Sequence, residues 1–364
     1  MNKIIFCGGG TGGHIYPALA IREIILQRAP NRSKISSAYI GLSNSMEAHI
    51  LAKYSDIPFL SIRAQGMPRE FTWKWIPFPF VNLFGAIDAI RHLREFAPNL
   101  VVATGGYVTF PVLLAARLMK IPYIIHEQNV IMGVTNRMFV GGARKILLSY
   151  PSEAFIRKDR FAFTGNPVRK EFLGQSHING LFHKKAGEFW ILVVGGSRGA
   201  KSINDACVEL SERWLPEHQN VRLLQITGER DFEMIKSRIS NGTRHFVYPY
   251  IHEMKEAFDV ADILISRAGA TILSELGVCA KPAILIPFPY ATDNHQEKNA
   301  RALEQIGAAR VILDKELNEK SLRFLLHEVM NPETLKRMGI AMQKSRPENV
   351  EERIYQEISP FLAN

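Results

Sequence analysis

At residues 7–17 the chain reads Cys7-Gly8-Gly9-Gly10-Thr11-Gly12-Gly13-His14-Ile15-Tyr16-Pro17, and this stretch decides the fold. The apolar run at residues 4–6 predicts a short buried strand in front of it. The apolar spacing of residues 18–26 predicts a helix behind it, and Pro17 suits the first turn of that helix, where no backbone N–H is needed. The chain therefore begins as a strand, a glycine loop and a helix, with His14 at the junction.

The glycines of this loop suit it to binding an anion. Five glycines within residues 8–13 are costly as regular structure, because each loses much backbone entropy. Such a loop, however, lets backbone N–H groups surround a bulky anion, and the helix behind it adds aligned amides and a positive partial charge. The loop therefore predicts a site for a phosphate or diphosphate group.

The composition indicates a globular protein of about two domains, because the chain has 364 residues and 46% of them are apolar. Charged residues make up 22% without a long run of one sign, which excludes a largely disordered chain. The net charge of +10 favours anionic partners such as nucleotides, pyrophosphates and phospholipid headgroups. Lysine and arginine are scattered instead of clustered with aromatic residues, so nucleic acid is not an expected partner.

The cysteines and the N-terminus point to the cytoplasm. Cys7, Cys207 and Cys279 are far apart, and no Cys-x-x-Cys pair occurs, so neither a disulfide framework nor a zinc site is expected. The N-terminus lacks the basic region and cleavage site of a signal peptide. The chain has no run of about 18 apolar residues, so no membrane-spanning helix is expected.

Strands and helices alternate along both halves of the chain, which predicts parallel α/β sheets with functional loops at the carboxyl ends of the strands. The break at residues 163–169 and the polar stretch 174–187 predict a domain boundary. Residues 189–200 then repeat the opening design of strand, glycine loop and helix. We expect an α/β fold of two doubly wound Rossmann-like domains facing a cleft: residues 1–165, residues 166–345, and a C-terminal helix in 346–364 packing back on the first. The expected strands are 4–7, 38–41, 59–62, 100–103, 123–126, 145–149, 161–164, 189–194, 222–227, 245–248, 263–266 and 283–286.

The aromatic stretch at residues 71–84 has two interpretations. Its prolines disfavour deep helix or strand, so one interpretation is a loop folded over the core. The other is an exposed patch in a membrane interface, since Trp and Phe suit that depth. Nearby cations would then contact anionic headgroups: Arg69, Lys74, Arg91 and Arg94.

Polar clusters follow several predicted strands. In residues 266–275, small residues let a diphosphate reach a helix N-terminus, and Glu275 either accepts hydrogen bonds from a ribose diol or is a solvated helix residue. After the next strand, Asp293, His295 and Gln296 suit sugar hydroxyls, although Asp293 could instead cap a helix. Three more clusters occur at residues 104–111, at 126–129 and at 195–199, where the Ser197 hydroxyl suits a phosphate.

The motifs that mark a metal or dinucleotide site do not occur. The chain has no Asp-x-Asp pair, no His-Glu-x-x-His and no P-loop lysine, and neither glycine loop combines Gly-x-Gly-x-x-Gly spacing with an acidic residue about 20 residues further on. Neither a metal nor a cofactor is therefore expected.

In order and spacing, these segments resemble the MurG family of bacterial glycosyltransferases over nearly the whole chain, on residues 8–17, 105–111, 126–129, 165–169, 195–200, 266–275 and 293–300. The resemblance implies the GT-B fold and a hexosyltransferase that works without a cofactor. The implied reaction is inverting transfer of N-acetylglucosamine from UDP-GlcNAc to the muramoyl C4 hydroxyl of undecaprenyl-pyrophosphoryl-MurNAc-pentapeptide (lipid I), giving lipid II for peptidoglycan synthesis. It implies a peripheral protein on the cytoplasmic face of the bacterial inner membrane, with an anionic membrane surface and cell-wall and division proteins as partners.

The resemblance also implies roles for individual residues. Glu275 would hold the ribose, the backbone of Ile251 the uracil, and Gln296 with His295 the sugar hydroxyls. The full implied UDP-GlcNAc site is Thr11, Gly12, Gly13, His14, Asn129, Arg169, Ser197, Ile251, Ala270, Glu275, His295 and Gln296. The implied acceptor site is Gly9, Gly10, Thr11, Gly105, Gly106 and Tyr107.

Two departures from the family pattern are modest. Arg198 stands where the family commonly has glutamine, which adds a cation near the phosphate loop or at the surface. Residues 131–137 lack the Pro-Gly often found there, so the shape of that loop is open.

For the reaction, His14 is the first candidate general base because imidazole titrates near neutrality, and Glu127 is the second. His14 could instead only orient the glycine loop or hydrogen-bond the acceptor. Since the second half accounts for the nucleotide, the loop at residues 8–13 is assigned to the lipid pyrophosphate. The alternative functions are another GT-B transfer to a lipid such as diacylglycerol, an NAD-dependent oxidoreductase, and a noncatalytic membrane scaffold.

Overall fold

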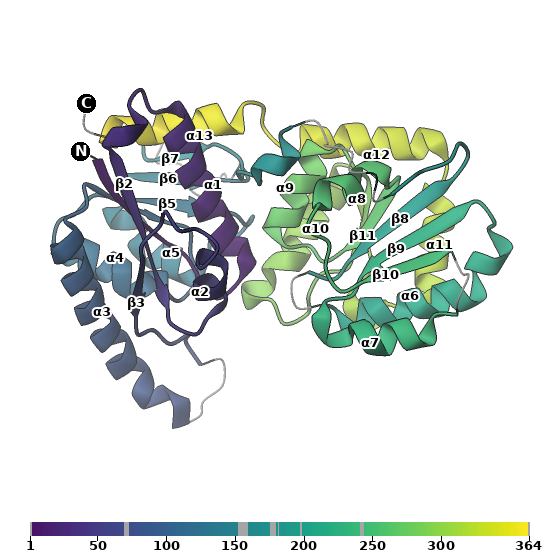
Figure 1. Ribbon diagram of the computed structural model, residues 1–364, viewed down its shortest axis with the longest axis horizontal. Coiled ribbons are helices and arrows are strands. Elements are labelled where there is room, and N and C mark those ends of the chain that lie inside the picture. Colours follow the sequence, from purple (N-terminus) through teal and green to yellow (C-terminus); the bar gives the residue numbers. More distant parts are fainter. Residues whose placement is uncertain are drawn as a thin grey trace. The chain divides into compact units, whose positions relative to one another are not determined.

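The chain forms two compact units in a computed structural model that describes residues 2–68, 73–151, 159–174, 180, 182–196, 199–240 and 244–362 (Figure 1). The first unit comprises Met1–Val168 and Pro347–Asn364, and the second comprises Arg169–Arg346. Within the described ranges, no helix combines the length and apolar character that crossing a bilayer requires.

The first unit is built on a parallel sheet with the strand order β3-β2-β1-β4-β5-β6-β7. The chain extends the sheet from β1 in one direction and then, from β4, in the other. In such sheets the ligand crevice opens at the carboxyl ends of the two strands where the direction reverses. The loops after β1 and β4 are therefore the ones placed to bind a ligand. The strands are β1 (Asn2–Cys7), β2 (Ile35–Leu42), β3 (Phe59–Ile62), β4 (Leu100–Ala103), β5 (Tyr123–Glu127), β6 (Lys145–Leu148) and β7 (Phe161–Phe163).

Helices cover both faces of this sheet, and the central strand β4 is accordingly apolar and buried at all its residues. Ile4 and Phe6 of β1 pack with residues of α1 and α13 on one face. Ile5 and Cys7, which alternate with them, pack with residues of α3, α4 and α5 on the other face. The helices are α1 (Gly12–Arg28), α2 (Met46–Leu51), α3 (Pro77–Phe96), α4 (Thr109–Leu118), α5 (Val134–Phe139) and α13 (Val350–Ile358).

The second unit repeats the design with the parallel order β10-β9-β8-β11-β12-β13, so its direction reverses between β8 and β11. Ile191 and Val193 of β8 share one apolar core with residues of α6 and α11. The strands are β8 (Phe189–Val194), β9 (Val221–Ile226), β10 (His245–Tyr248), β11 (Ile263–Ser266), β12 (Ala283–Leu285) and β13 (Ala309–Val311). The helices are α6 (Lys201–Arg213), α7 (Glu229–Arg238), α8 (Met254–Val260), α9 (Ala270–Val278), α10 (His295–Gln305), α11 (Glu319–Val329) and α12 (Pro332–Lys344).

The expected fold class of two parallel α/β sheets is confirmed, and each expected strand occurs within a few residues of its expected place. Among the strands of the described residues, β13 alone is additional to those expected, because three residues carry too little pattern to predict a strand.

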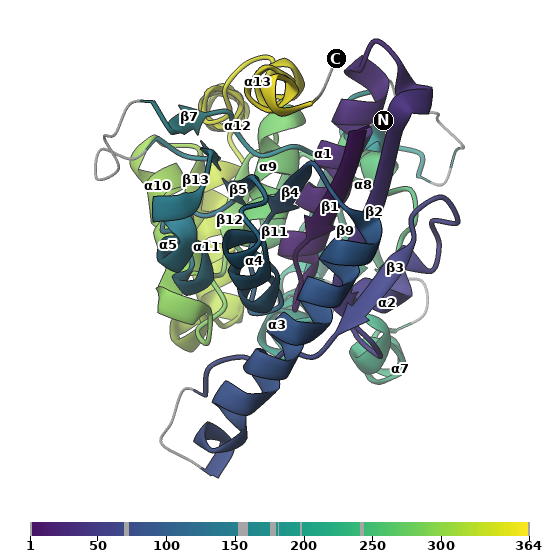
Figure 2. The ribbon, with the colours of Figure 1, turned by 90° about the vertical axis from the view of Figure 1, so that its left-hand side faces the viewer.

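The expectation that prolines disfavour a helix at residues 71–84 is wrong for its second half. Helix α3 begins at Pro77 and runs for 20 residues, with its two prolines in the first turn, where a missing N–H costs nothing. Its first turns project beyond the sheet (Figure 2). Arg69, Phe71 and Thr72 lie outside the described residues, as does the side chain of Lys74.

Candidate functional site

The two loops at the reversal point of the first sheet pack directly against each other. The Gly9 N–H donates to the Gly105 carbonyl at 3.2 Å. A Cβ on Gly106 would lie 2.2 Å from the Gly9 oxygen, and a Cβ on Gly8 would lie 2.0 Å from Oγ1 of Thr104. Glycine is therefore required here for the close packing of the two loops, in addition to the anion binding expected from the sequence.

His14 lies where these loops meet, in the first turn of α1. Its Nδ1 is 2.9 Å from the Thr104 carbonyl oxygen and 3.0 Å from Oε1 of Gln128. Both neighbours accept hydrogen bonds, so Nδ1 carries the proton and Nε2 of the neutral ring is the basic nitrogen. A Cβ on Gly105 would lie 3.2 Å from the His14 ring, so this glycine makes room for it.

The acceptor-side residues predicted from the sequence surround the same loops. The Tyr107 ring lies against Gly10, whose added Cβ would be 3.0 Å from Cε1 of Tyr107. Thr11 is exposed and is the N-cap of α1, and its side chain makes no capping hydrogen bond. The structure thus brings Gly9, Gly10, Gly105, Gly106 and Tyr107 together.

Glu127, the second candidate base, is buried at the end of β5 and holds the loop that follows. Its Oε1 accepts from the backbone N–H and Nδ2 of Asn129, at 3.0 and 3.1 Å. Its Oε2 accepts from the Gly133 N–H at 2.9 Å and from Nδ2 of Asn136 at 2.8 Å. Four donors therefore occupy both oxygens, and the carboxylate fixes the position of Asn129.

The stretch at residues 131–137, whose shape the sequence left open, leads into α5 through Gly133. Asn136 of α5 was not singled out from the sequence. Its Oδ1 is buried and has no partner among the described residues, and its Nδ2 lies 3.2 Å from where a Gly105 Cβ would be. Asn136 therefore borders Gly105 in the same site and carries a buried acceptor that no described residue satisfies.

In the second unit, the loops after β8 and β11 occupy the reversal point. Gly196 and Gly199 have φ values of +91° and +73°, which favour glycine. Ala270 is the first residue of α9, whose N-cap is Gly269. The Thr271 hydroxyl is buried there without a partner in the described part of the chain. Ser197 and Arg198 lie outside the described residues.

Glu275 and Arg169 were predicted as separate contacts and are paired in the structure. Nε of Arg169 lies 2.9 Å from Oε1 of Glu275, and its NH1 lies 2.8 Å from Glu171. Glu275 is 3% exposed, so the interpretation of a solvated helix residue is wrong. Burial raises the pKa of the Glu275 carboxyl, and the Arg169 guanidinium opposes that rise.

Gln296 joins two loops of the predicted sugar site. Its Oε1 accepts from the Ala268 N–H at 3.2 Å and from the Phe288 N–H at 3.0 Å. These bonds orient the amide, and within the described ranges its Nε2 donates to no protein group. Nδ1 of His295 donates to the Thr292 carbonyl at 2.7 Å. Ile251 follows β10 and is buried.

Arg267, which did not stand out in the sequence, ties the same loops together. Its guanidinium pairs with Asp314 and donates to the Ser202 hydroxyl at 3.1 Å. It also donates to the carbonyls of Ile286 and Pro287 at 3.2 and 3.3 Å. Its place directly after a buried strand was the only sequence signal for this role.

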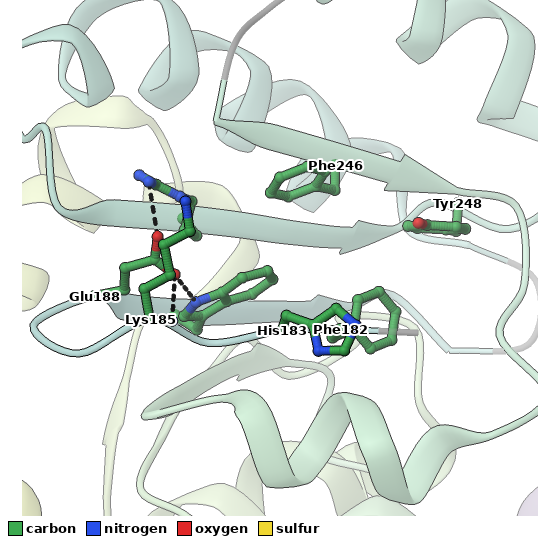
Figure 3. Close-up of a pocket in the computed structure, with 8 residues that line it drawn as sticks. Phe182, His183, Lys185, Glu188, Phe246 and Tyr248 are labelled. Carbon is green, nitrogen blue, oxygen red and sulfur yellow. Dashed lines mark hydrogen bonds and ion pairs between the residues drawn. The ribbon is translucent and has the colours of Figure 1, made fainter. Parts of the chain in front are cut away.

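A hollow of about 270 Å³ lies elsewhere in the second unit, lined by residues that include the starts of β8, β9 and β10 (Figure 3). Its polar groups pair with one another, since Glu188 binds Arg222 at 2.8 Å and accepts from Nε1 of Trp190 at 2.9 Å. The Trp190 and Phe246 rings stack at 5.6 Å. Because the loops named above follow the other ends of the strands, we assign this hollow to packing of the sheet.

Comparisons with known proteins agree with this arrangement. The profile of the glycosyltransferase family 28 N-terminal domain matches residues 4–148, and that of the family 28 C-terminal domain matches residues 190–354. Two curated relatives are named UDP-N-acetylglucosamine--N-acetylmuramyl-(pentapeptide) pyrophosphoryl-undecaprenol N-acetylglucosamine transferase. The protein of Bacillus cytotoxicus is 38% identical over 94% of each chain, and that of Desulforamulus reducens is 39% identical over 95% of each chain.

Solved structures show the same architecture. MurG of Acinetobacter baumannii superposes with a TM-score of 0.78 at 26% identity, covering 99% of this chain and 100% of its own. The UDP complex of S. aureus MnaA, at 14% identity, a TM-score of 0.71 and coverage of 100% and 98%, shares the fold alone. With both domain profiles matched and relatives at this identity along nearly its whole length, the chain belongs to glycosyltransferase family 28.

Proposed function

We propose that this glycosyltransferase transfers N-acetylglucosamine from UDP-GlcNAc to the muramoyl C4 hydroxyl of lipid I, giving lipid II for peptidoglycan. The observation that carries the proposal is the 38% identity over 94% of the chain to a transferase named for that reaction. A reaction between two diphosphate-bearing substrates requires two sites that bind a diphosphate. The glycine loop at the reversal point of each sheet suits one of them.

The donor is assigned to the second unit. The N-terminus of α9, with Ala270 and the unpartnered Thr271 hydroxyl, suits the diphosphate. The Glu275 carboxylate accepts hydrogen bonds from the ribose diol, and Nε2 of Gln296 donates to a hydroxyl of the sugar. Arg169 stabilises the charged form of Glu275, and we assign its guanidinium a share in binding the phosphates. Ser197, Ile251 and His295 complete the donor contacts proposed within this unit.

The acceptor is assigned to the first unit, with its pyrophosphate at the loop of residues 8–13 and its sugar near His14. The basic Nε2 of His14 takes the proton from the attacking C4 hydroxyl as UDP leaves the anomeric carbon. Glu127 is occupied by four donors, so we assign it to holding Asn129 instead of to proton transfer.

The test of this function is transfer of labelled N-acetylglucosamine to a lipid I analogue, run in parallel with diacylglycerol and with EDTA. We expect transfer to lipid I in both the presence and the absence of EDTA. Transfer to diacylglycerol alone would establish the alternative lipid acceptor, and a lack of UDP release would exclude a transferase.

Donor binding is expected to weaken as the pH falls from neutrality. The pKa of Glu275 is raised by burial, so its carboxyl protonates at a higher pH than usual and then loses an acceptor for the ribose. Arg169→Met removes the cation that opposes this rise, so the loss of affinity should begin at a higher pH still. Titration of UDP-GlcNAc by calorimetry across acidic pH checks this. If affinity fell over the same pH range in the wild type and in Arg169→Met, the role assigned to Arg169 would be contradicted.

We propose that α3 places the protein on the cytoplasmic face of the bacterial inner membrane, with an anionic surface and neighbouring cell-wall and division proteins as its partners. Trp73 is 87% exposed, and Ile76 and Phe80 are 61% and 60% exposed. The Arg63 guanidinium lies over the Phe84 ring at 5.0 Å. Apolar side chains beside cations suit the boundary between headgroups and acyl chains.

Replacing Phe80 and Leu83 with serine should weaken binding to vesicles of anionic phospholipid by about 100-fold or more, since burying each side chain contributes about 1.5 kcal/mol or more. Transfer to a detergent-solubilised acceptor should stay near normal. Vesicle sedimentation measures the effect. Phe324→Ser, at a 71% exposed phenylalanine of α11, is the matched control. Equal loss with that control would contradict the assignment.

A further inference from the structure

A buried chain of hydrogen bonds runs behind His14 in the first unit. Nε2 of His126 lies 3.2 Å from the Gly165 carbonyl oxygen. Nδ1 of His126 lies 2.9 Å from Nε2 of Gln128, and Oε1 of Gln128 lies 3.0 Å from Nδ1 of His14. His126 is 0% exposed and Gln128 is 1% exposed. Three polar side chains are therefore connected in series, and the two behind the half-buried His14 have little access to water.

The direction of this chain follows from its two ends. A carbonyl oxygen can only accept, so Nε2 of His126 must carry a proton towards Gly165. Burial lowers the pKa of His126 to about 4, so the ring is neutral near pH 7 and its Nδ1 is an acceptor. The Gln128 amide must then present its NH₂ group to His126. It also donates to the His126 carbonyl at 2.9 Å, which holds the same orientation.

The orientation of this amide decides the state of His14. With its NH₂ group towards His126, Gln128 presents only its oxygen to Nδ1 of His14. The Thr104 carbonyl at 2.9 Å is a second acceptor for the same nitrogen. The proton therefore sits on Nδ1, and Nε2 keeps a free lone pair. A reversed amide would instead present a donor to Nδ1 and favour the other tautomer.

We propose that His126 and Gln128 are positioning residues that set the tautomer and orientation of His14 through this relay, leaving Nε2 as the atom that receives the acceptor's proton. The inference rests on the proposed role of His14 as general base. When His14 becomes an imidazolium, Gln128 accepts a hydrogen bond from a charged donor, which is stronger than the bond to the neutral ring.

The substitutions tested below leave the other titratable groups around His14 unchanged. Glu47 of α2 accepts from the Gly10 N–H at 3.4 Å, and Glu127 of β5 is held by four donors. Tyr107 comes from the turn before α4, and His126 acts through Gln128. Among the described residues, Glu47, Glu127 and His126 make no direct bond to the His14 ring, so a change at residue 128 reports on the relay.

Two substitutions at Gln128 should move the pH–rate profile in opposite directions. Gln128→Met removes the acceptor, which destabilises the imidazolium, so the acid limb of kcat/KM should move to lower pH. The maximal rate should fall by about 10- to 100-fold, the range for one hydrogen bond to a charged group. Gln128→Glu places a carboxylate against Nδ1, so the acid limb should move to higher pH. A residue that only supports the fold would lower the rate without these opposite shifts.

Gln225→Met is the matched control, because Gln225 is a buried glutamine bonded to a buried histidine in the second unit, 2.8 Å from Nε2 of His245. It should reduce stability comparably while the acid limb stays in place. Unshifted profiles in both Gln128 variants, or the same shift in the control, would overturn the proposal.

The tautomer of His14 can be measured by NMR without any turnover, on wild-type protein labelled with ¹⁵N-histidine. The His14 signals are identified by their loss in His14→Gln. We expect one-bond coupling to a proton at Nδ1 of His14 and none at Nε2, and a mixture of tautomers in His126→Phe. A proton on Nε2 in the wild type would overturn the relay even if the Gln128 variants fail to fold. Full activity of His14→Ala would instead refute the base role while leaving the measured tautomer standing, so the two failures are distinguishable.

Discussion

Replacing His14 with alanine is expected to lower kcat by about 10²–10⁴-fold, the usual contribution of a positioned general base. The affinity for UDP-GlcNAc should stay near the wild-type value, because the proposed donor contacts of Glu275 and Gln296 lie in the second unit. The physical reason is that Nε2 of His14 is the unprotonated nitrogen of the neutral ring. Single-turnover transfer to a lipid I analogue measures the rate, and calorimetry measures donor binding.

His49→Ala is the control for this experiment. His49 is an exposed histidine of α2 in the same unit, and its Nδ1 bonds only the local Ser45 carbonyl among described groups. Its kcat should be unchanged. Equal losses of kcat and donor affinity in His14→Ala would assign His14 to supporting the glycine loops instead of to proton transfer.

Glu275→Gln is expected to raise the dissociation constant for UDP-GlcNAc by about 10- to 100-fold, because hydrogen bonds to a charged acceptor contribute about 1.5–3 kcal/mol each. The turnover at saturating donor should change little. Glutamine keeps the shape of the buried side chain, so the loss reports on charge and acceptor capacity instead of on a cavity. Alanine would also leave the Arg169 guanidinium without its buried partner.

Glu328→Gln is the matched control for the donor site. Glu328 also pairs with an arginine in the second unit, 2.8 Å from Arg310, but its side chain is 41% exposed. Its donor affinity should be that of the wild type. Unchanged affinity in Glu275→Gln would contradict the assignment of this carboxylate to the ribose. The two main variants therefore separate chemistry from donor binding, one lowering kcat and the other raising the dissociation constant.

Local pattern was sufficient for most of the fold. The run before Cys7 and the run before Gly195 are strands because short apolar segments bounded by glycine can be buried on both faces of a parallel sheet. The exception at Pro77 has a local cause as well. A proline is tolerated in the first turn of a helix, so Pro77 in the sequence is compatible with either a helix start or a loop. The structure decides between the two, because α3 begins at this residue and its first turns are exposed.

For the site, the sequence identified most of the chemical groups but not their pairing. Glu127 looked like a base by type, yet its four donors come from a loop and a helix turn whose shape the sequence left open. Arg267 and Gln128 lie within the clusters at residues 266–275 and 126–129, but neither was assigned a role, because neither stands out by type or spacing. Their roles arise from neighbours brought close by the folded sheet.

By itself the sequence determined the two α/β units, the glycine loops at strand ends, and the presence of His14, Glu275 and Gln296 beside them. The tertiary structure alone decided which groups are partners. Thr104 and Gln128 lie 90 and 114 residues from His14, and Arg169 lies 106 residues from Glu275. A hydrogen bond depends on a separation of about 3 Å and on the direction of donor and acceptor, which spacing along the chain does not encode. The protonated nitrogen of His14 was therefore decided by the packing of β5 and the β4–α4 turn against α1.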